Sequence, residues 1–451
     1  MSKNIPLRKG LDIKLDGVAE KKLQKLPLAA QYALSPLDFE GLTPKLLVKV
    51  GDKVEAGTPL FYNKYDERVV FTSPVSGTVS AINRGEKRKI LGVIVDADAT
   101  ITYKEFTKVD PAKATREEVV ELLLSSGLWP LFIQRPYGII ADPSITPKSI
   151  FVSTFDSAPL APDYNFVLSA EGANIQKGIE VLKSLTSGKV HFGLDGKADS
   201  SLSKMKGVEF TSFSGKHPAG NVGVQIHHVD PISKGDTVWT INIQDLAIVG
   251  RLFSTGKVDM TKIVALTGSE VKVPGYYQIV GGAPISTITA GNVKEQEEGD
   301  SIRTISGNVL TGVKSDAEGY IAFYANSLTL IPEGDKYEFI GWLMPRFSKF
   351  SVSKSYFSWL CPKKSYRLDT NVNGGRRPFV VTGLYEKYLP MDIYPMHLLK
   401  AIIARDIDKM ENLGIYEVVE EDFALCEFVD PSKTDMQQII REGINYMIKE
   451  A

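Results

Sequence analysis

Strand-type and helix-type segments alternate between residues 105 and 260, and this alternation restricts the possible folds more than any other feature of the sequence. Thr115 and Glu118 form a capping-box pattern ahead of the apolar run 119–124, and Gly127 marks the end of that helix. Further elements are predicted as a strand over 149–154, a helix over 169–185 and a strand over 189–194. Strands that alternate with helices pair in parallel, so this region is predicted to be an α/β domain with a parallel sheet.

The stretch 214–256 opens with a loop in which glycine recurs. Several glycines allow the backbone to approach a ligand closely, but they also suit a plain loop between two strands. The predicted elements are a glycine-spaced loop (Gly215, Gly220, Gly223), a strand over 222–226, a turn over 231–236 and a second strand over 237–243.

The same stretch holds His217, His227 and His228, three of the five histidines of the chain. A strand would place the neighbouring side chains of His227 and His228 on opposite faces, so they are not expected to bind one ion together. We expect one of the two to be hydrogen-bonded in the core and the other to be exposed. No histidine or cysteine spacing indicates zinc, and no metal site is predicted.

Residues 46–95 are typical of a small β-domain. The pattern V-x-x-G-D-x-V-x-x-G, followed by S-P-V-S-G-x-V, resembles the biotinyl/lipoyl barrel-sandwich fold. Carriers of that fold hold a modifiable lysine between methionines at a hairpin tip. Lys64 is expected to precede the tip, and the segment 62–68 contains no methionine. The sequence therefore predicts the scaffold without a covalently bound carrier group.

The bulk composition limits the remaining classes of function. A chain of 451 residues predicts three or four domains, and a net charge of −1 does not indicate a nucleic-acid partner. Cys361 and Cys426 cannot supply an ordinary four-cysteine iron–sulfur cluster, and they fit a reducing cytosol. Neither a secretory signal nor a run of 18 apolar residues is present, so no membrane span is predicted.

Long, unusual strings along the chain resemble the A subunit of the bacterial sodium-translocating NADH:quinone reductase. They are LRKGLDIKLDG (7–17), VVFTSPVSGTVSAINRGEKR (69–88), FDSAPLAPDYNF (155–166), HPAGNVGVQIHHVDPI with GDTVWTINIQDLAIVGRLFSTG (217–256) and TGLYEKYLPMDIYPMHLLKAII (382–403). More distantly, the layout resembles the C subunit of the Rnf complex and the flavin-binding subunit of complex I.

The resemblance implies a multidomain α/β and β chain. The predicted parts are an N-terminal region with a barrel-sandwich domain (1–104), a Rossmann-like α/β domain (105–260), a β-grasp domain similar to the soluble-ligand-binding module (261–335), and a basic-aromatic segment with a helical C-terminal domain (336–451). It also implies a peripheral subunit on the cytoplasmic side of the inner membrane, in a six-subunit complex that oxidises NADH, reduces ubiquinone and moves sodium. The isolated chain is expected not to be catalytic.

In the more distant relatives a glycine-rich loop follows the capped helix and holds flavin or nucleotide phosphate. The corresponding residues here are 128–138, LWPLFIQRPYG, where Trp129, Pro130, Phe132 and Pro136 fill space and prolines remove N–H donors. Trp129 and Phe132 are expected to be core residues, with a pocket for an apolar ring as the alternative. No FMN is predicted, because this segment cannot hold its phosphate. No iron–sulfur cluster is predicted either, since Cys426 is the only one of the cluster cysteines of the Rnf relative that this chain retains.

Residues 341–380 are rich in cations and aromatic rings. The basic residues are Arg346, Lys349, Lys354, Lys363, Lys364, Arg367, Arg376 and Arg377, against one acid, Asp369; the aromatic residues are Trp342, Phe347, Phe350, Tyr356, Phe357, Trp359 and Tyr366. Cations favour anionic lipid headgroups and aromatic rings favour the membrane interface. The segment is predicted to dock on a membrane or on another subunit, with a linker whose aromatic residues are buried as the alternative.

Three functions follow as hypotheses: a quinone-associated subunit of the respiratory complex, a free-standing NADH or flavin dehydrogenase module, and a biotin or lipoyl carrier. The dehydrogenase module would need a phosphate loop and the carrier would need a lysine-bearing tip, and the sequence indicates neither. For the first, a quinone slot is suggested in the loop 216–223, with donors from His217, Asn221 and His227 or His228 and with Trp239 as an apolar wall. Otherwise this loop joins strands or contacts another subunit.

Overall fold

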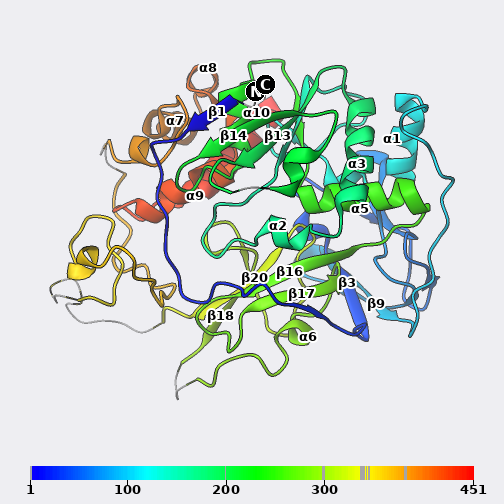
Figure 1. Ribbon diagram of the computed structural model, residues 1–451, viewed down its shortest axis with the longest axis horizontal. Coiled ribbons are helices and arrows are strands. Elements are labelled where there is room, and N and C mark those ends of the chain that lie inside the picture. The colour runs from blue at the N-terminus through cyan, green and yellow to red at the C-terminus, as the bar shows by residue number, and fades with distance from the viewer. Residues whose placement is uncertain are drawn as a thin grey trace.

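The computed structural model describes residues 3–198, 200–296, 300–335, 341, 343, 346–379 and 383–450. Within these residues the strands form sheets of seven, six, four and three strands. In Figure 1 the six-stranded sheet lies below the seven-stranded sheet.

The seven-stranded sheet has the order β1-β14-β13-β12-β15-β10-β11. Its strands are β1 (Lys3–Pro6), β10 (Ile133–Arg135), β11 (Ile139–Ile140), β12 (Ser149–Ser153), β13 (Lys189–Asp195), β14 (Glu209–Ser214) and β15 (Val238–Thr240). β12 pairs in parallel with both β13 and β15, and β14 pairs in parallel with β13. The predicted parallel sheet is confirmed, with β10 added in antiparallel orientation at one side.

Helices cover both faces of this sheet. They are α1 (Arg116–Ser125), α2 (Tyr164–Val167), α3 (Gly172–Leu185), α4 (Val222–Val229) and α5 (Ile243–Thr255), together with the 3-10 turns η3 (Trp129–Leu131) and η4 (Ser201–Lys204). The predicted capping box is confirmed, because the Thr115 side chain accepts from the Glu118 N–H and the Glu118 carboxylate accepts from the Thr115 N–H. α3 and α5 lie against each other in Figure 1.

The strand predicted over 222–226 is wrong: these residues begin helix α4. Val224, Gln225 and Ile226 are all buried, although they are consecutive. A short helix enclosed on several sides shows no helical period in its sequence, and an alternation of apolar residues over five positions does not distinguish it from a strand.

The six-stranded sheet has the order β19-β18-β20-β16-β17-β2. Its elements are β2 (Leu23–Lys25), β16 (Thr261–Thr267), β17 (Gly275–Val280), β18 (Ile302–Ser306), β19 (Val313–Ser315), β20 (Ser327–Pro332) and the helix α6 (Ile285–Thr289). β2 pairs with β17, whereas β1 pairs with β14 of the seven-stranded sheet. The N-terminal segment 3–25 therefore ties two sheets together, which no sequence pattern indicated.

Two small antiparallel sheets form the N-terminal β-region. The elements are β3 (Gln31–Leu34), β4 (Pro44–Leu46), β5 (Lys53–Val54), β6 (Pro59–Asn63), β7 (Asp66–Thr72), β8 (Gly77–Arg84) and β9 (Ile90–Ala97), with the turns η1 (Pro36–Asp38) and η2 (Glu86–Arg88). Lys64 and Tyr65 form the turn between β6 and β7. The expectation that Lys64 precedes a hairpin tip is thus wrong, although its neighbours are Asn63 and Tyr65 and not methionines.

The C-terminal elements pack on the face of the seven-stranded sheet that also carries α4. They are η6 (Tyr385–Lys387), α7 (Pro395–Ile403), α8 (Ile407–Asn412), η7 (Ile415–Glu417), α9 (Glu420–Val429) and α10 (Met436–Glu450), whereas the 3-10 turn η5 (Phe357–Leu360) belongs to the loops at the left of Figure 1. Neighbouring residues of β15 face two different cores. Val238 packs with α4 and the C-terminal helices, whereas Trp239 packs in the core on the opposite face of the sheet. No helix in the described ranges has the length and apolar character required to cross a bilayer.

Candidate functional site

His227 and His228 fasten α4 to the C-terminal helices. The Nε2 atom of His227 accepts from the Asp392 N–H at 2.9 Å, which leaves Nδ1 to donate to the Glu417 carboxylate at 2.7 Å. His228 donates from Nε2 to the Pro390 carbonyl at 2.9 Å. Both side chains are half-buried and hydrogen-bonded. The expectation of one core and one exposed histidine is therefore wrong, because consecutive side chains of a helix diverge by only about 100° around its axis and do not point to opposite faces as in a strand.

His217 is buried at the carboxyl end of β12. Its Nδ1 lies 3.1 Å from the Ser157 hydroxyl, and its backbone N–H donates to Asp12 at 2.9 Å. Burial lowers the pKa of His217 from 6.5 to about 4, against the opposing charge of Asp12. The imidazole is therefore neutral at pH 7 and acts in the structure as a hydrogen-bonding core residue.

This lowered pKa predicts an acid-sensitive contribution to stability. Above pH 6.5 the histidine is neutral in both states, and between pH 6.5 and 4 the unfolded chain takes up the proton first, so stability falls as the pH falls. We expect a loss of up to about 3 kcal/mol from this residue over that range. Urea unfolding of wild type and His217→Gln at pH 7 and pH 4.5 measures it: the difference between the two proteins should shrink or reverse at the lower pH. Parallel pH profiles would contradict the assignment.

Trp239 does not share a slot with His217 and Asn221. Its fully buried ring lies on the opposite face of the sheet, 5.4 Å from Trp129 and 6.2 Å from Phe132 between ring centroids. The part of the quinone hypothesis in which Trp239 walls that slot is wrong, because alternate residues of β15 face different cores.

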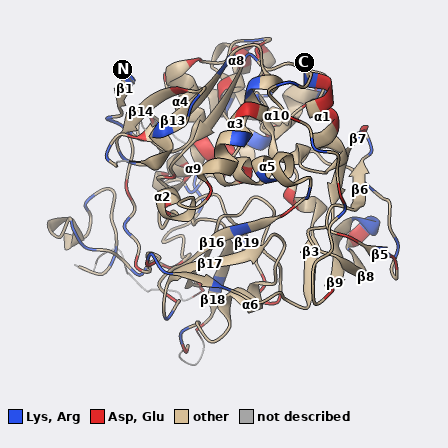
Figure 2. Cartoon of the chain, turned by 45° about the vertical axis from the view of Figure 1, so that its right-hand side comes forward, with Lys and Arg blue, Asp and Glu red and all other residues tan. Residues whose placement is uncertain are grey.

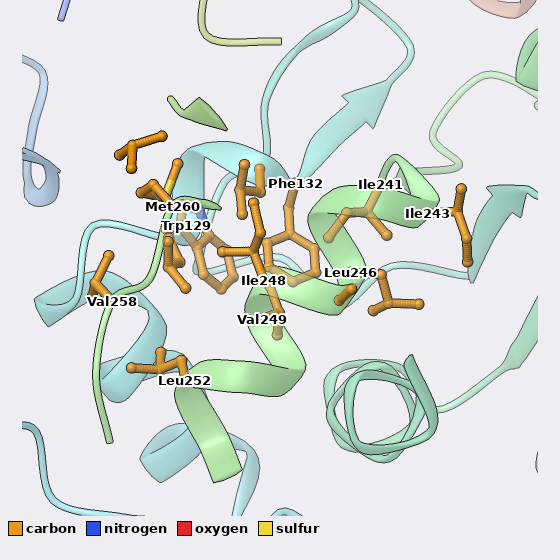
Figure 3. Packing of buried hydrophobic residues seen from close by; sticks show 14 of the residues in the cluster. Trp129, Phe132, Ile241, Ile243, Leu246, Ile248, Val249, Leu252, Val258 and Met260 are labelled. Atoms are coloured by element: carbon orange, nitrogen blue, oxygen red, sulfur yellow. The ribbon is translucent and has the colours of Figure 1, made fainter. Parts of the chain in front are cut away.

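The prediction that Trp129 and Phe132 fill the core is confirmed. Both side chains have no exposed surface, and the Trp129 indole donates to the Ala141 carbonyl at 2.7 Å. Figure 3 shows the two rings packed beside apolar side chains of α5, among them Ile248 and Val249. This part of the segment 128–138 therefore belongs to the central core and offers no open loop to a phosphate.

A cavity of about 280 Å³ lies at the carboxyl end of β15, bounded by β10, by the first turns of α4 and α5 and by the start of α9. Its apolar lining consists of Leu131, Ile133, Val222, Ile241 and Val419. Its polar lining consists of Arg135, Thr240, Asn242, Asp245, Tyr324, Glu420, Glu421 and Arg441. The α/β sheet, the β-grasp region and the C-terminal helices thus all contribute to one polar cavity with apolar walls.

Arg135, which lines one side of this cavity, belongs to a buried ion pair. The Arg135 guanidinium donates to Asp422 at 2.8 Å and lies 3.5 Å from Glu421, and the Arg135 and Asp422 side chains are 4% and 0% exposed. A Cβ atom on Gly223 would lie 2.5 Å from both Arg135 and Asp422. The absence of a side chain at Gly223 therefore makes room for the Arg135–Asp422 ion pair of the protein itself, not for a ligand.

Most polar atoms of the cavity are already hydrogen-bonded within the protein. Thr240 donates to the Ile133 carbonyl, Asn242 donates to the Tyr164 hydroxyl, Tyr324 donates to the Pro130 carbonyl, and Arg441 donates to Glu420 and to the Tyr137 carbonyl. Asp245 differs. Its residue is 4% exposed and lines the cavity, and its carboxyl group has no hydrogen bond or ion pair with any residue that the structure describes.

Two cavity carboxyls have raised pKa values. Burial raises the pKa of Asp245 to about 6, a rise that the charge of Lys262 opposes. Loss of hydration and the neighbouring Asp422 raise the pKa of Glu421 to about 7, against the opposing charge of Arg135. With pKa values of about 6 and about 7, these two carboxyls can gain or lose a proton near neutral pH.

Comparison with known proteins gives one consistent family over the whole chain. Residues 5–98 match the family model of the NqrA N-terminal barrel-sandwich hybrid domain, 114–258 that of the NqrA second alpha/beta domain, and 263–317 that of the NQRA C-terminal domain. The A subunit of the Na(+)-translocating NADH-quinone reductase of Rhodopirellula baltica is 38% identical over 98% of both chains. The chain belongs to this NqrA family.

Further members of the NqrA family agree with this assignment. The protein from Saccharophagus degradans is 38% identical over 99% of this chain and all of its own length, and that of Neisseria meningitidis serogroup A is 36% identical over the same shares. These relatives are named as subunits of an NADH-quinone reductase that translocates Na⁺. The predicted barrel-sandwich, α/β and β-grasp parts thus correspond to the matched domains of the NqrA family.

For this NqrA-family chain, sequence reasoning found the loop beside the cavity but missed the cavity itself. Asn221 touches its border, since its amide donates to the Glu421 carbonyl at 3.4 Å, and Val222 lines it. Arg135, Asp245 and Glu421 lie far apart in the sequence. The one available signal was a charged residue, Asp245, inside the mostly apolar segment 241–249. No group of three or more histidine, cysteine or acidic residues that could hold a metal occurs in the described part of the chain.

Proposed function

We propose that this chain is a peripheral, cytoplasmic-side subunit of a sodium-translocating NADH:ubiquinone oxidoreductase and that its cavity at Asp245 binds the quinone headgroup. One observation carries the proposal: a buried carboxyl without a partner among the described residues faces a ring-sized space with apolar walls. Small-ligand sites combine such walls with few placed polar groups. The partners would be the other subunits of the six-subunit complex.

The chemistry of quinone suits the two titrating carboxyls. Reduction of quinone to quinol takes up two electrons and two protons, and each proton ends on one former carbonyl oxygen. Protonated Asp245 can donate a hydrogen bond to a carbonyl, and ionised Asp245 can accept one from the quinol hydroxyl. Glu421 offers the same exchange near pH 7. The electrons would come from carriers in other subunits, so this chain would contribute binding and protons.

The alternative, a soluble NADH or flavin dehydrogenase module, fits the same residues less well. A volume of about 280 Å³ is at the lower end for small-molecule sites and holds a ring, not a dinucleotide. The buried side chains of Trp129 and Phe132 occupy the segment that would hold a flavin phosphate. We therefore also propose that the α/β domain is Rossmann-like and binds no FMN, and that the chain carries no iron–sulfur cluster.

Quinone binding to the isolated chain tests the proposal. We expect the affinity for a short-chain ubiquinone to fall as the pH rises through the pKa of Asp245 near 6, because the ionised carboxyl no longer donates to a carbonyl. The Asp245→Asn variant keeps an amide donor at every pH, so it should lack the fall in affinity near pH 6, and any remaining pH dependence should follow Glu421 near pH 7. The expected difference is two- to tenfold at pH 8, about 0.5–1.5 kcal/mol for one hydrogen bond. Isothermal titration calorimetry measures it.

A second pair of variants locates the site. Val222→Trp should abolish quinone binding, because the larger side chain fills the cavity, whereas Val222→Ala should retain it. The matched control is His217→Gln, which alters the loop 216–223 outside the cavity lining. Normal quinone affinity in Val222→Trp, together with weakened binding in His217→Gln, would contradict the cavity and favour the loop.

A further inference from the structure

We propose that the segment 346–379 inserts its tip into an anionic lipid leaflet. The tip is defined by the apolar residues Phe347, Phe357, Trp359 and Leu360 and by the lysines Lys354, Lys363 and Lys364. This inference concerns how the chain meets a bilayer, whereas the proposed function concerns what the cavity binds. Either can fail without the other.

The apolar residues of the tip lie on the surface. Phe347, Phe357, Trp359 and Leu360 are 50%, 49%, 48% and 56% exposed. The rings of Phe347 and Phe357 lie 6.1 Å apart, and Phe357 begins the 3-10 turn η5. Neighbouring exposed aromatic side chains are unusual on a surface in contact only with water, and they indicate contact with a partner or a membrane. The alternative of a linker with buried aromatic residues is wrong for these positions; Trp342 lies outside the described residues.

The lysines of the tip stand beside these side chains. The Lys354 ammonium lies 5.7 Å from the Trp359 ring centroid, and Lys364 donates to the Phe347 carbonyl at 2.9 Å. Among the described residues, no ion pair with an acid involves Lys354, Lys363 or Lys364. Figure 2 shows the loops of this segment at the left of the molecule, away from β5 to β9.

The base of the segment is fixed to the rest of the protein. Arg367 donates to Glu270 at 2.8 Å, Arg376 pairs with Asp435, and Tyr366 is buried and bridges to Leu15. Arg367 and Arg376 at the base are thus paired with acids, whereas the three lysines of the tip have no acid partner among the described residues. This division gives a fixed support with an apolar, positively charged end.

A lipid surface fits this end better than a protein does. Protein interfaces are depleted in lysine at their centres and need a shaped surface, whereas a lipid leaflet adapts to any shape. Lysine side chains can extend their ammonium groups to phosphate while the aromatic rings lie at the level of the headgroups. The tip carries positive charges and no acidic residue, so it is attracted to an anionic leaflet.

Vesicle binding of the full-length chain tests the inference. In a Trp342→Phe background, the remaining tryptophans are the fully buried Trp129 and Trp239 and the exposed Trp359. We expect a blue shift of the fluorescence, and quenching by brominated lipid, with phosphatidylcholine vesicles that contain phosphatidylglycerol. Phosphatidylcholine alone should give little of either, and salt should reverse the binding. Adding Trp359→Phe should remove the signal but keep co-sedimentation.

Charge reversal provides the matched control. Lys354→Glu, Lys363→Glu and Lys364→Glu together should weaken vesicle binding about tenfold or more. The control reverses Lys45, Lys53 and Lys89, which are exposed residues of the N-terminal β-region at the other side of the molecule, with the same change in net charge. Equal losses in both triple variants, or no binding to anionic vesicles, would overturn the inference. Salt-insensitive binding only to membranes that contain partner subunits would overturn it in favour of a protein partner.

Discussion

Replacing Asp422 by Asn is expected to lower the free energy of unfolding by about 3–5 kcal/mol, because it leaves the buried Arg135 guanidinium without its closest counter-charge. Asparagine keeps a side-chain oxygen that can accept from the Val419 N–H, as Asp422 does at 2.9 Å, so the start of α9 should remain capped. Urea denaturation followed by circular dichroism measures the change. The same variant should weaken quinone binding, because Asp422 holds Arg135, which lines the cavity.

Two further variants separate charge burial from general disruption. Asp435→Asn removes the partner of Arg376 in an exposed pair, whose side chains are 46% and 77% exposed, and should cost less than about 1 kcal/mol. Arg135→Met combined with Asp422→Leu removes both buried charges and should recover much of the stability lost in Asp422→Asn. An Asp422→Asn protein as stable as Asp435→Asn would show that the pair is hydrated in solution.

Gly250→Ala is expected to destabilise the α/β domain by about 1–3 kcal/mol, although alanine is the better helix former by about 1 kcal/mol. A Cβ atom at Gly250 would lie 1.8 Å from the Asn174 carbonyl oxygen of α3, and one at Gly178 would lie 2.6 Å from the Leu246 carbonyl oxygen. The two helices pack backbone against backbone at these glycines, so a methyl group must push them apart. The thermal unfolding midpoint measures the loss.

The control for this prediction is another glycine of the same helix pair. At Gly172, the first residue of α3, the nearest atom to an added Cβ is the Met205 methyl at 3.8 Å, an ordinary contact. Gly172→Ala should leave stability unchanged or raise it. Equal destabilisation in both variants would mean that helix propensity or local strain, and not the close approach of α3 and α5, decides the outcome.

The sequence determined those elements in which local signals agreed. The capping box of Thr115 and Glu118, the strands β12 and β13 and the helix α3 were all predicted, because caps, periodicity and turn residues act within a few positions of the chain. The filled core at Trp129 and Phe132 was also predictable, since bulky apolar side chains and prolines cannot form a phosphate loop. The long matching strings indicated the family.

Only the tertiary structure decided α4 and the cavity. The sequence of 222–226 suits either a strand or a buried helix, and the C-terminal helices that enclose it come from residues about 200 positions later, as in the bond from Asn221 to Glu421. Arg135 and Asp422 are 287 positions apart, and Asp245 faces the cavity because β10, α4 and α9 meet around it. Local sequence patterns carry no information on which distant side chains share a low-dielectric space, and it is that shared space which shifts the pKa values and provides the site.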